Sequence, residues 1–179
     1  MPAHSPPDQS PQWWARAACW LCLACALPSV AWRVAMLLGA DTGFRLAHLY
    51  RGSAFGTAYV LGLEALQVGA AILCLGLAYS WGERVPRWVP RAGGRVIPWR
   101  LPLVVGGVGN TLLYIIIYGV TILFSLRWLG WAQGFTPTPG MSPAQVVVLT
   151  LAYAPMLAWP PALTVALAGY RRRRVRRVP

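Results

Sequence analysis

The sequence of 179 residues contains no lysine and only four acidic residues against sixteen arginines, so its net charge is +12. Charged residues make up 11% of the chain and hydrophobic residues 57%, with a mean hydropathy of +0.51. A soluble globular domain carries about 25% charged residues. This shortage of charge argues against an ordinary soluble domain and predicts that most of the surface faces lipid. The exclusive use of arginine is typical of a high-GC bacterial genome.

Motifs that carry chemistry are also lacking. The two histidines lie in the N-terminal tail and in a loop, and the sequence has no hydrolase triad, phosphate-binding loop or metal-ligand motif. Cys19, Cys22 and Cys25 form a C-x-x-C-x-x-C pattern inside an apolar run. A regular helix cannot wrap three cysteines around a tetrahedral ion. We therefore interpret them as small packing residues and expect no cofactor and no metal.

Four long apolar runs are present, at residues 17–38, 57–79, 101–126 and 144–169. Each exceeds the roughly 20 residues that a helix needs to cross a hydrocarbon core. Membrane-spanning strands would alternate apolar and polar residues in segments of about ten, and these runs do not alternate. The runs therefore predict an all-α, polytopic membrane protein with a four-transmembrane-helix bundle over residues 17–169.

The two ends of the chain differ from the apolar runs. Residues 1–16 are rich in proline and predict a disordered tail, whereas residues 170–179 are mostly arginine and predict a basic tail. Arginines are retained on the cytoplasmic side of a membrane. The outer loops hold only Arg45, Arg51 and Arg127, while the tails and the second loop hold most of the others. We therefore predict a plasma-membrane protein with both termini in the cytoplasm.

The first apolar run has a second interpretation. Arg16, the apolar stretch after it and the small residues Ser29 and Ala31 are similar to a signal peptide with its cleavage site. Cleavage would leave three helices and place the N-terminus outside. We favour the uncleaved helix, because apolar residues continue to Leu38 and four helices satisfy the charge rule.

Arg33 and Glu64 are the two ionisable side chains that lie clearly within the predicted spans. At 1.5 Å per residue, Arg33 lies about 8 Å and Glu64 about 10 Å below the outer end of its helix. Adjacent antiparallel helices place these depths at one level, so we predict an Arg33–Glu64 ion pair that acts as a structural clamp. Alternatively, Arg33 reaches the outer headgroups while Glu64 is protonated or bonded to other neighbours.

The second helix carries two faces that favour contact with protein. One presents Glu64 and Gln67, and polar side chains are costly against lipid. The other consists of small residues, which allow helices to approach closely. Its members are Ala58, Gly62, Ala65, Gly69 and Gly76. We therefore predict that the second helix lies at the centre of the bundle.

The third helix carries a polar stripe that we expect to face inward. Its members are Asn110, Tyr114, Tyr118, Thr121 and Ser125. In one interpretation the stripe lines a polar cavity beside Glu64. The candidate intramembrane polar site would then consist of six residues, namely Arg33, Glu64, Gln67, Asn110, Tyr114 and Tyr118. The other interpretation, which we favour, is hydrogen bonding between helices.

Prolines interrupt the fourth run at Pro155, Pro160 and Pro161. Each proline removes a backbone hydrogen bond and crowds the preceding turn, so a kink or break is predicted. Broken helices form ion sites in some transporters, but proline is also frequent in membrane helices in general.

The arginines of the second loop and the C-terminal tail are predicted to contact lipid headgroups. They adjoin membrane helices, so the expected partner is anionic lipid at the cytoplasmic face rather than nucleic acid, at about 1 kcal/mol per residue. The residues concerned are Arg84, Arg87, Arg91, Arg95, Arg171, Arg172, Arg173 and Arg174.

The second loop carries the most distinctive string of the chain. It reads Trp81-Gly82-Glu83-Arg84-Val85-Pro86-Arg87-Trp88-Val89-Pro90, followed by Gly93-Gly94-Arg95 and Pro98. Together with Leu63-Glu64-Ala65-Leu66, this string resembles a group of small, uncharacterised four-helix membrane proteins of high-GC Gram-positive bacteria. The resemblance is strongest over residues 60–100. It implies the same membrane topology and no activity.

These observations favour an integral membrane protein without catalytic activity, in a structural, accessory or interaction role. A second copy of the chain or another membrane protein is the expected protein partner. A small transporter or channel is the second hypothesis. A membrane thiol oxidoreductase is a distant third, because such chemistry needs a paired and accessible thiol.

Overall fold

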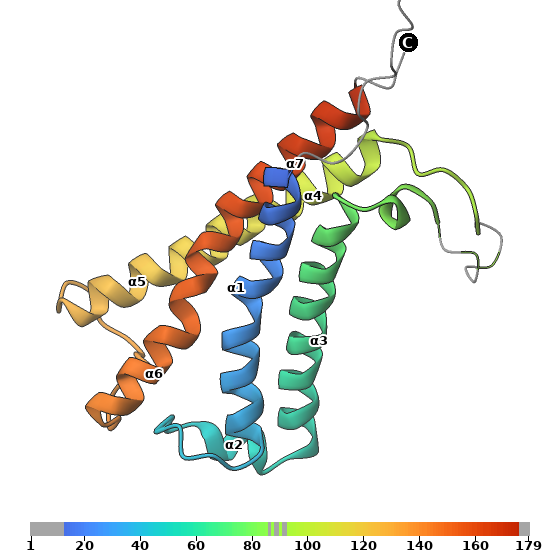
Figure 1. Cartoon of the computed structure of the whole chain (residues 1–179). Coiled ribbons are helices and arrows are strands. Elements are labelled where there is room, and N and C mark those ends of the chain that lie inside the picture. The colour runs from blue at the N-terminus through green and yellow to red at the C-terminus, as the bar shows by residue number, and fades with distance from the viewer. Residues whose placement is uncertain (1–12, 86, 88–89, 91–92, 176–179) are drawn as a thin grey trace, which may run out of the picture.

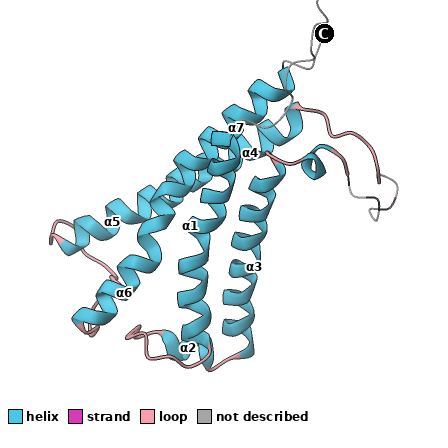
Figure 2. Ribbon diagram, viewed as in Figure 1, coloured by secondary structure: helices cyan, strands magenta, loops and turns pink. Residues whose placement is uncertain are grey.

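The computed structural model describes residues 13–85, 87, 90 and 93–175, and these residues are arranged almost entirely as helices. Within them, four helical stretches are long and apolar enough to cross a membrane, as the sequence predicts. Figure 2 shows the helices and the loops that join them. The stretches are Trp13–Leu37, Ala54–Gly76, Arg100–Trp128 and Pro143–Val175.

The first two spans are uninterrupted helices, α1 (Trp13–Leu37) and α3 (Ala54–Gly76), connected through the short helix α2 (Ala47–Arg51). The predicted N-terminal tail ends earlier than expected, since residues 13–16 form the first turn of α1. The rest of that tail lies outside the described residues. At the start of α3, the Ser53 hydroxyl accepts a hydrogen bond from the backbone of Gly56, which satisfies one of the free amides of a helix end.

The third span consists of α4 (Arg100–Leu113), a π-helical turn η2 (Tyr114–Tyr118) and α5 (Gly119–Trp128). The sequence analysis predicts a single regular helix here and misses the π turn. A π turn closes its backbone hydrogen bonds between residues five apart rather than four apart, so it widens the helix. It therefore changes which side chains of α4 and α5 share a face.

The fourth span is broken, as its prolines predict. It consists of α6 (Pro143–Tyr153), the 3₁₀ segment η3 (Ala154–Ala158) and α7 (Trp159–Val175). Pro160 and Pro161 occupy the first turn of α7, where a missing amide costs least. The predicted basic tail begins later than expected, because residues 170–175 continue α7. Residues 176–179 lie outside the described part of the chain.

Helix α1 and the fourth span form the centre of the bundle, since α1 packs against α3, α6, η3 and α7, and α7 also packs against α4. The prediction that the second span lies at the centre is therefore wrong. The space around Gly62 and Gly69 is open on the small-residue face of α3. The side of α1 that meets its neighbours is itself built from Ala, Cys and Ser, so α1 provides the close-packing surface that we expect on α3.

The long spans cross the short ones obliquely. In Figure 1, α1 and α3 run side by side, while α5 and α6 diverge from them toward the end at which α2 lies. The third and fourth spans contain 29 and 33 residues, well beyond the roughly 20 that a perpendicular crossing needs. An oblique path would accommodate this excess length in a bilayer.

Candidate functional site

The candidate site lies where α1 and α3 bury their facing residues. On α3 this face contains Val60, Glu64, Ala71 and Cys74 at helical spacing. Opposite them, α1 contributes small side chains. Small residues bring the two helix axes close together, and this is why polar side chains from one helix can reach the backbone of the other.

Arg33 and Glu64 form the predicted ion pair, with 2.8 Å between Arg33 Nε and Glu64 Oε1. Glu64 is only 5% exposed. Among the described residues, no donor is aligned for a hydrogen bond to either carboxylate oxygen of Glu64. The Nε–H of Arg33 is directed at the carbonyl of Ser29, 3.5 Å away. Charge and proximity, rather than a directed hydrogen bond, therefore hold the two side chains together.

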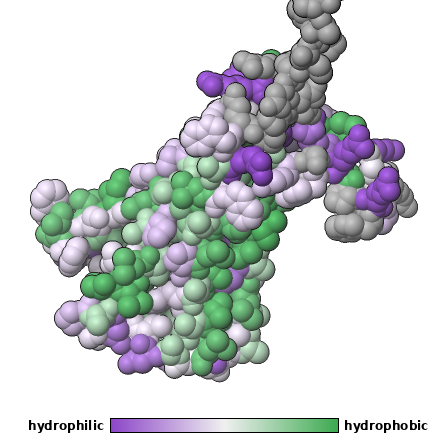
Figure 3. Space-filling view, viewed as in Figure 1, coloured by the Kyte–Doolittle hydropathy of each residue, from purple (hydrophilic) through white to green (hydrophobic). Residues whose placement is uncertain are grey.

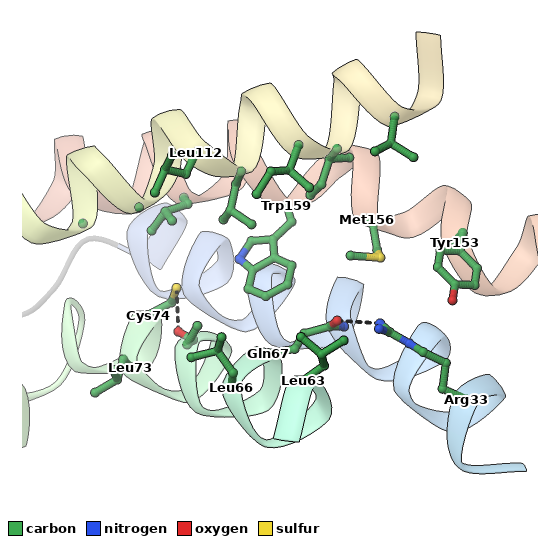
Figure 4. Close-up of a pocket in the computed structure, with 18 of the residues that line it drawn as sticks. Arg33, Leu63, Leu66, Gln67, Leu73, Cys74, Leu112, Tyr153, Met156 and Trp159 are labelled. Carbon is green, nitrogen blue, oxygen red and sulfur yellow. Dashed lines mark hydrogen bonds between the residues drawn. The ribbon is translucent and has the colours of Figure 1, made fainter. Parts of the chain in front are cut away.

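Gln67 joins this pair to the backbone of α1. Its Oε1 accepts a 2.6 Å hydrogen bond from Arg33 Nη2, and its Nε2 donates to the Ser29 hydroxyl at 2.8 Å and to the Ala26 carbonyl at 3.1 Å. Figure 4 shows the Arg33–Gln67 bond. Both ends of the amide are satisfied, so Gln67 fixes the guanidinium beside Glu64.

The guanidinium of Arg33 also contacts the fourth span. Its Cζ lies 5.8 Å from the centroid of the Tyr153 ring, a distance at which a cation is attracted to the ring face. Trp32, the neighbour of Arg33, packs edge-on against the same ring, with 5.8 Å between centroids. One cluster therefore ties α1 to α3 through Glu64 and Gln67, and to α6 through Tyr153.

The polar stripe of the third span faces the fourth span. Asn110 Nδ2 donates to Thr164 Oγ1 at 2.7 Å, and the Tyr114 hydroxyl lies 3.3 Å from the same oxygen. The Tyr118 hydroxyl donates to the carbonyl of Leu157 at 3.0 Å. In a regular helix that carbonyl would accept from residue 161, which is proline and has no amide hydrogen. Tyr118 therefore supplies a hydrogen bond that the broken helix cannot make itself.

The six residues of the predicted intramembrane polar site separate into two groups. Arg33, Glu64 and Gln67 meet at the α1–α3 contact, whereas the hydrogen bonds of the stripe go to α7 and η3. Thr121, further along the stripe, donates to the Ile117 carbonyl of its own helix. The hydrogen bonds of Asn110, Tyr114 and Tyr118 thus run between helices, in keeping with the interpretation that we favour from the sequence.

A large apolar groove adjoins both groups. It has a volume of about 1380 Å³ and lies between α3 on one side and α4, η2 and α5 on the other. Arg33, Gln67 and Tyr153 line part of it, while Leu63, Leu66, Leu73, Leu112 and Met156 give it an apolar character (Figure 4). Glu64 is not among its lining residues.

The four cysteines are free and buried. Cys19, Cys22, Cys25 and Cys74 lie in one apolar cluster with Trp159. Cys74 Sγ is hydrogen-bonded to the carbonyl of Ala70 at 3.2 Å. Within the described ranges, His, Cys, Asp and Glu side chains form no group that could hold a metal ion.

The arginines at the end of α7 have two kinds of environment. Arg173 donates to the carbonyls of Leu77 and Ala78 at 2.9 Å each, and its guanidinium lies 3.1 Å from Glu83. Arg174 lies 3.4 Å from Glu83 and donates to the carbonyl of Ile97. These two arginines thus fasten α7 to the end of α3 and to the second loop.

The other predicted headgroup arginines are exposed where the structure describes them. They are Arg84, Arg87, Arg95, Arg171 and Arg172, whereas Arg91 lies outside the described residues. Figure 3 shows hydrophilic residues gathered along the second loop and near the end of α7, beside largely hydrophobic helix surfaces. Headgroup contact stays a prediction for these arginines.

The N-terminal end of α1 is fastened by Tyr79, which lies three residues after the end of α3. Trp20 Nε1 donates to the Tyr79 hydroxyl at 3.1 Å, and the Arg16 guanidinium lies 5.4 Å from the centre of the Tyr79 ring. A hydrogen bond from Arg16 is the main cause that lowers the pKa of Tyr79 below its ordinary value.

Several participating residues are missed from the sequence. Ser29 lies one turn from Arg33, so its place beside the pair follows from helical spacing once the pair is known. Tyr153 and Thr164 carry no such signal, because their roles depend on how the fourth span breaks and crosses the others. The sequence analysis includes Gln67 among the polar site residues but does not predict its hydrogen bond to Arg33.

Comparison with known proteins adds no assignment: no family model, curated protein or solved structure matches the chain.

Proposed function

We propose that this chain is a non-catalytic integral membrane protein of the plasma membrane, with both termini in the cytoplasm and a structural or accessory role toward other membrane components. The observation that carries this proposal is the use of its intramembrane polar groups. Arg33 Nε and Glu64 Oε1 lie 2.8 Å apart, and the Gln67 amide is hydrogen-bonded to Arg33, to the Ser29 hydroxyl and to the Ala26 carbonyl. Groups engaged in this way stabilise a bundle.

The apolar groove supports the same proposal. A translocation path for ions is generally lined by charged or polar groups, whereas this groove is lined mostly by aliphatic and aromatic side chains. The resemblance of the second loop to small four-helix membrane proteins is compatible with this role and adds no activity to it.

A small transporter or channel is the second candidate, favoured by one observation. Arg33 and Gln67 line the groove, and the Arg33 side chain is 19% exposed. A polar ligand that entered the groove would meet these groups before it reached Glu64.

Flux measurements distinguish the two candidates. The purified chain and a Glu64→Gln variant would be reconstituted in liposomes loaded with a pH-sensitive or chloride-sensitive dye. We expect both to leak no faster than empty liposomes. A flux that the unmodified chain supports and Glu64→Gln abolishes would favour the transporter and contradict our proposal.

An accessory role also has a positive test. Crosslinking in native membranes, followed by mass spectrometry of the crosslinked peptides, is expected to join this chain to a second copy or to another membrane protein. Recovery of the chain as an uncrosslinked monomer at all crosslinker concentrations would contradict the accessory role.

A further inference from the structure

The groove between α3 and α4–α5 is left unfilled by the chain itself. Its walls carry large exposed apolar side chains: Leu66 and Leu73 on α3 are 71% and 69% exposed, and Val105 on α4 is 63% exposed. All three line the groove. In water such walls would close on each other, but in a bilayer a lateral groove is filled by whatever apolar group fits it.

One end of the groove has a defined polar boundary. Trp81, Arg84 and Leu101 line it there. Arg84 is exposed and belongs to a hairpin-like segment in which it pairs with Val96. Backbone hydrogen bonds of 2.9 Å from Val85 to Arg95 and from Ile97 to Glu83 hold this segment in place.

Contacts from α7 fix the same segment to the bundle. Arg174 donates to the carbonyl of Ile97 at 2.9 Å, and its Nη1 lies 3.4 Å from Glu83. Because Glu83 is engaged by Arg173 and Arg174, the charge at the groove end is net positive. An apolar groove that ends at a positioned, exposed guanidinium is complementary to an amphiphile with an anionic head.

We infer that the inner half of this groove binds one anionic phospholipid. Its phosphate lies at Arg84, beside Trp81, and its acyl chains lie between α3 and α4. One leaflet is about 15 Å thick, so the chains run along about ten residues of each wall at 1.5 Å per residue. They pass Leu73 and Leu66 on α3, and Leu101 and Gly109 on α4. This inference rests on the membrane insertion contained in the proposed function. A helix of another protein would also fit an apolar groove, but it would leave the placement of Arg84 unexplained.

The headgroup part is tested by replacing Arg84. The full chain would be reconstituted in nanodiscs that contain equal amounts of phosphatidylglycerol and phosphatidylcholine, and the lipid retained after transfer to mild detergent would be counted by native mass spectrometry. We expect retention of phosphatidylglycerol over phosphatidylcholine, and about a fivefold loss of that preference in Arg84→Gln, since one arginine contributes about 1 kcal/mol. Arg171→Gln, which removes an exposed arginine that does not line the groove, should keep the preference.

The acyl-chain part is tested by filling the groove. Gly109 lines the groove, Gly107 does not, and a Cβ at either position would meet no atom within 4 Å. Gly109→Leu should therefore displace the retained lipid, while the matched control Gly107→Leu should keep it. Ala70→Leu, on the opposite wall, provides a second variant, and far-ultraviolet circular dichroism reports whether each variant is folded.

Three outcomes would overturn the inference. They are equal retention of the two lipids by the unmodified chain, unchanged retention in folded Gly109→Leu and Ala70→Leu, or a loss of oligomer rather than of lipid in these variants, which would identify the occupant as a helix. Extraction of membranes with alkaline carbonate separates this failure from failure of the proposed function. A chain released by carbonate was never inserted in the bilayer.

Discussion

At the residue scale, the environment of Glu64 determines how much stability the α1–α3 contact loses when one charge of the ion pair is removed. The carboxylate is buried, lies 2.8 Å from Arg33 Nε and receives no aligned hydrogen bond from the described residues. A buried charge without its partner is more costly than the pair is stabilising. The two side chains are therefore coupled, and the effect of removing one depends on whether the other is present.

This coupling predicts an asymmetry between single and double substitutions. Glu64→Leu leaves Arg33 unpaired and should lower the free energy of unfolding by about 3 kcal/mol or more. The double variant Arg33→Met/Glu64→Leu removes both charges and should recover much of that loss. Unfolding in mixed micelles with increasing dodecyl sulfate measures both values. A Glu64→Leu variant as stable as the unmodified chain would show that the pair contributes nothing.

Arg173 and Arg171 provide a second comparison, within one basic run. Arg173 donates to two carbonyls at the end of α3, whereas Arg171 is exposed. Hydrogen bonds from charged groups contribute about 1.5–3 kcal/mol, so Arg173→Gln should destabilise the bundle by an amount in this range. Arg171→Gln should change stability by less than about 0.5 kcal/mol.

Thermal unfolding in detergent measures the stability difference between the two arginine variants. Hydrogen exchange at residues 77–83 localises it, because amides near the released carbonyls should exchange faster only in Arg173→Gln. Equal stability and equal exchange in the two variants would assign Arg173 to the lipid surface, as the sequence analysis predicts for the whole basic run.

The ion pair could be predicted from the sequence, but the contacts that Arg173 and Arg174 make with protein could not. Arg33 and Glu64 are isolated charges in apolar runs, so their depth along each helix limits what they can meet. Arg173 and Arg174 lie in a run of identical residues at a helix end. Nothing in such a run indicates which members turn toward protein, since that depends on where the second loop places Glu83 and Ile97.

At the scale of the helices, the third and fourth spans are joined by polar contacts that compensate for irregular backbone. The Tyr118 hydroxyl donates to the Leu157 carbonyl, which Pro161 cannot bond because proline has no amide hydrogen. The Asn110 amide donates to the hydroxyl of Thr164, one helical turn after Pro160. Across the π turn at residues 114–118, Tyr114 and Tyr118 both face the fourth span.

The contribution of this contact is measurable with two adjacent residues. Asn110 bonds across to α7, whereas Thr111 bonds only the Gly107 carbonyl of its own helix. Asn110→Ala should cost between about 0.6 and 1.7 kcal/mol, the range for interhelical hydrogen bonds in membranes. Thr111→Ala should be close to neutral. Dodecyl sulfate unfolding would be used for both variants, and equal effects would mean that the interhelical bond adds no stability.

The two irregular segments differ in how well the sequence predicts them. The break at residues 154–158 follows from proline, which removes amides regardless of tertiary context. The π turn lies in a Tyr-Ile-Ile-Ile-Tyr segment that is compatible with a regular helix. It lies where the third span contacts η3 of the broken fourth span, and the sequence of the segment alone does not reveal it.

At the scale of the whole molecule, the number of spans follows from run length, but their arrangement does not. Small residues on α1 and α3 indicate equally well that either helix can be closely packed. The structure uses the surface of α1 and leaves Gly62 and Gly69 of α3 in open space. Which surface is used depends on the oblique course of the third and fourth spans, and hydrophobicity alone does not specify that course.

The proposed orientation can be tested by labelling single cysteines in cells. Gln133 in the third loop and Val96 in the second loop are exposed, while the four natural cysteines are buried and give a low background. A membrane-impermeant maleimide should label Gln133→Cys in intact cells, and Val96→Cys only after permeabilisation. The reverse pattern would place both termini outside, and labelling of both positions in intact cells would indicate a different number of crossings.

The unequal lengths of the spans have a consequence for how the protein, inserted as we propose, would respond to its membrane. At 1.5 Å per residue, α3 is about 35 Å long, whereas the third span is about 43 Å and the fourth about 50 Å, against a hydrocarbon core of about 30 Å. Hydrophobic mismatch is relieved by tilt. In a bilayer with longer acyl chains, the third and fourth spans should therefore tilt less and move toward α3. The groove between α3 and α4–α5 should become narrower. Spin labels at Leu63 and Ile116 should come closer together as lipid chain length increases, so that this bundle reports bilayer thickness as a distance.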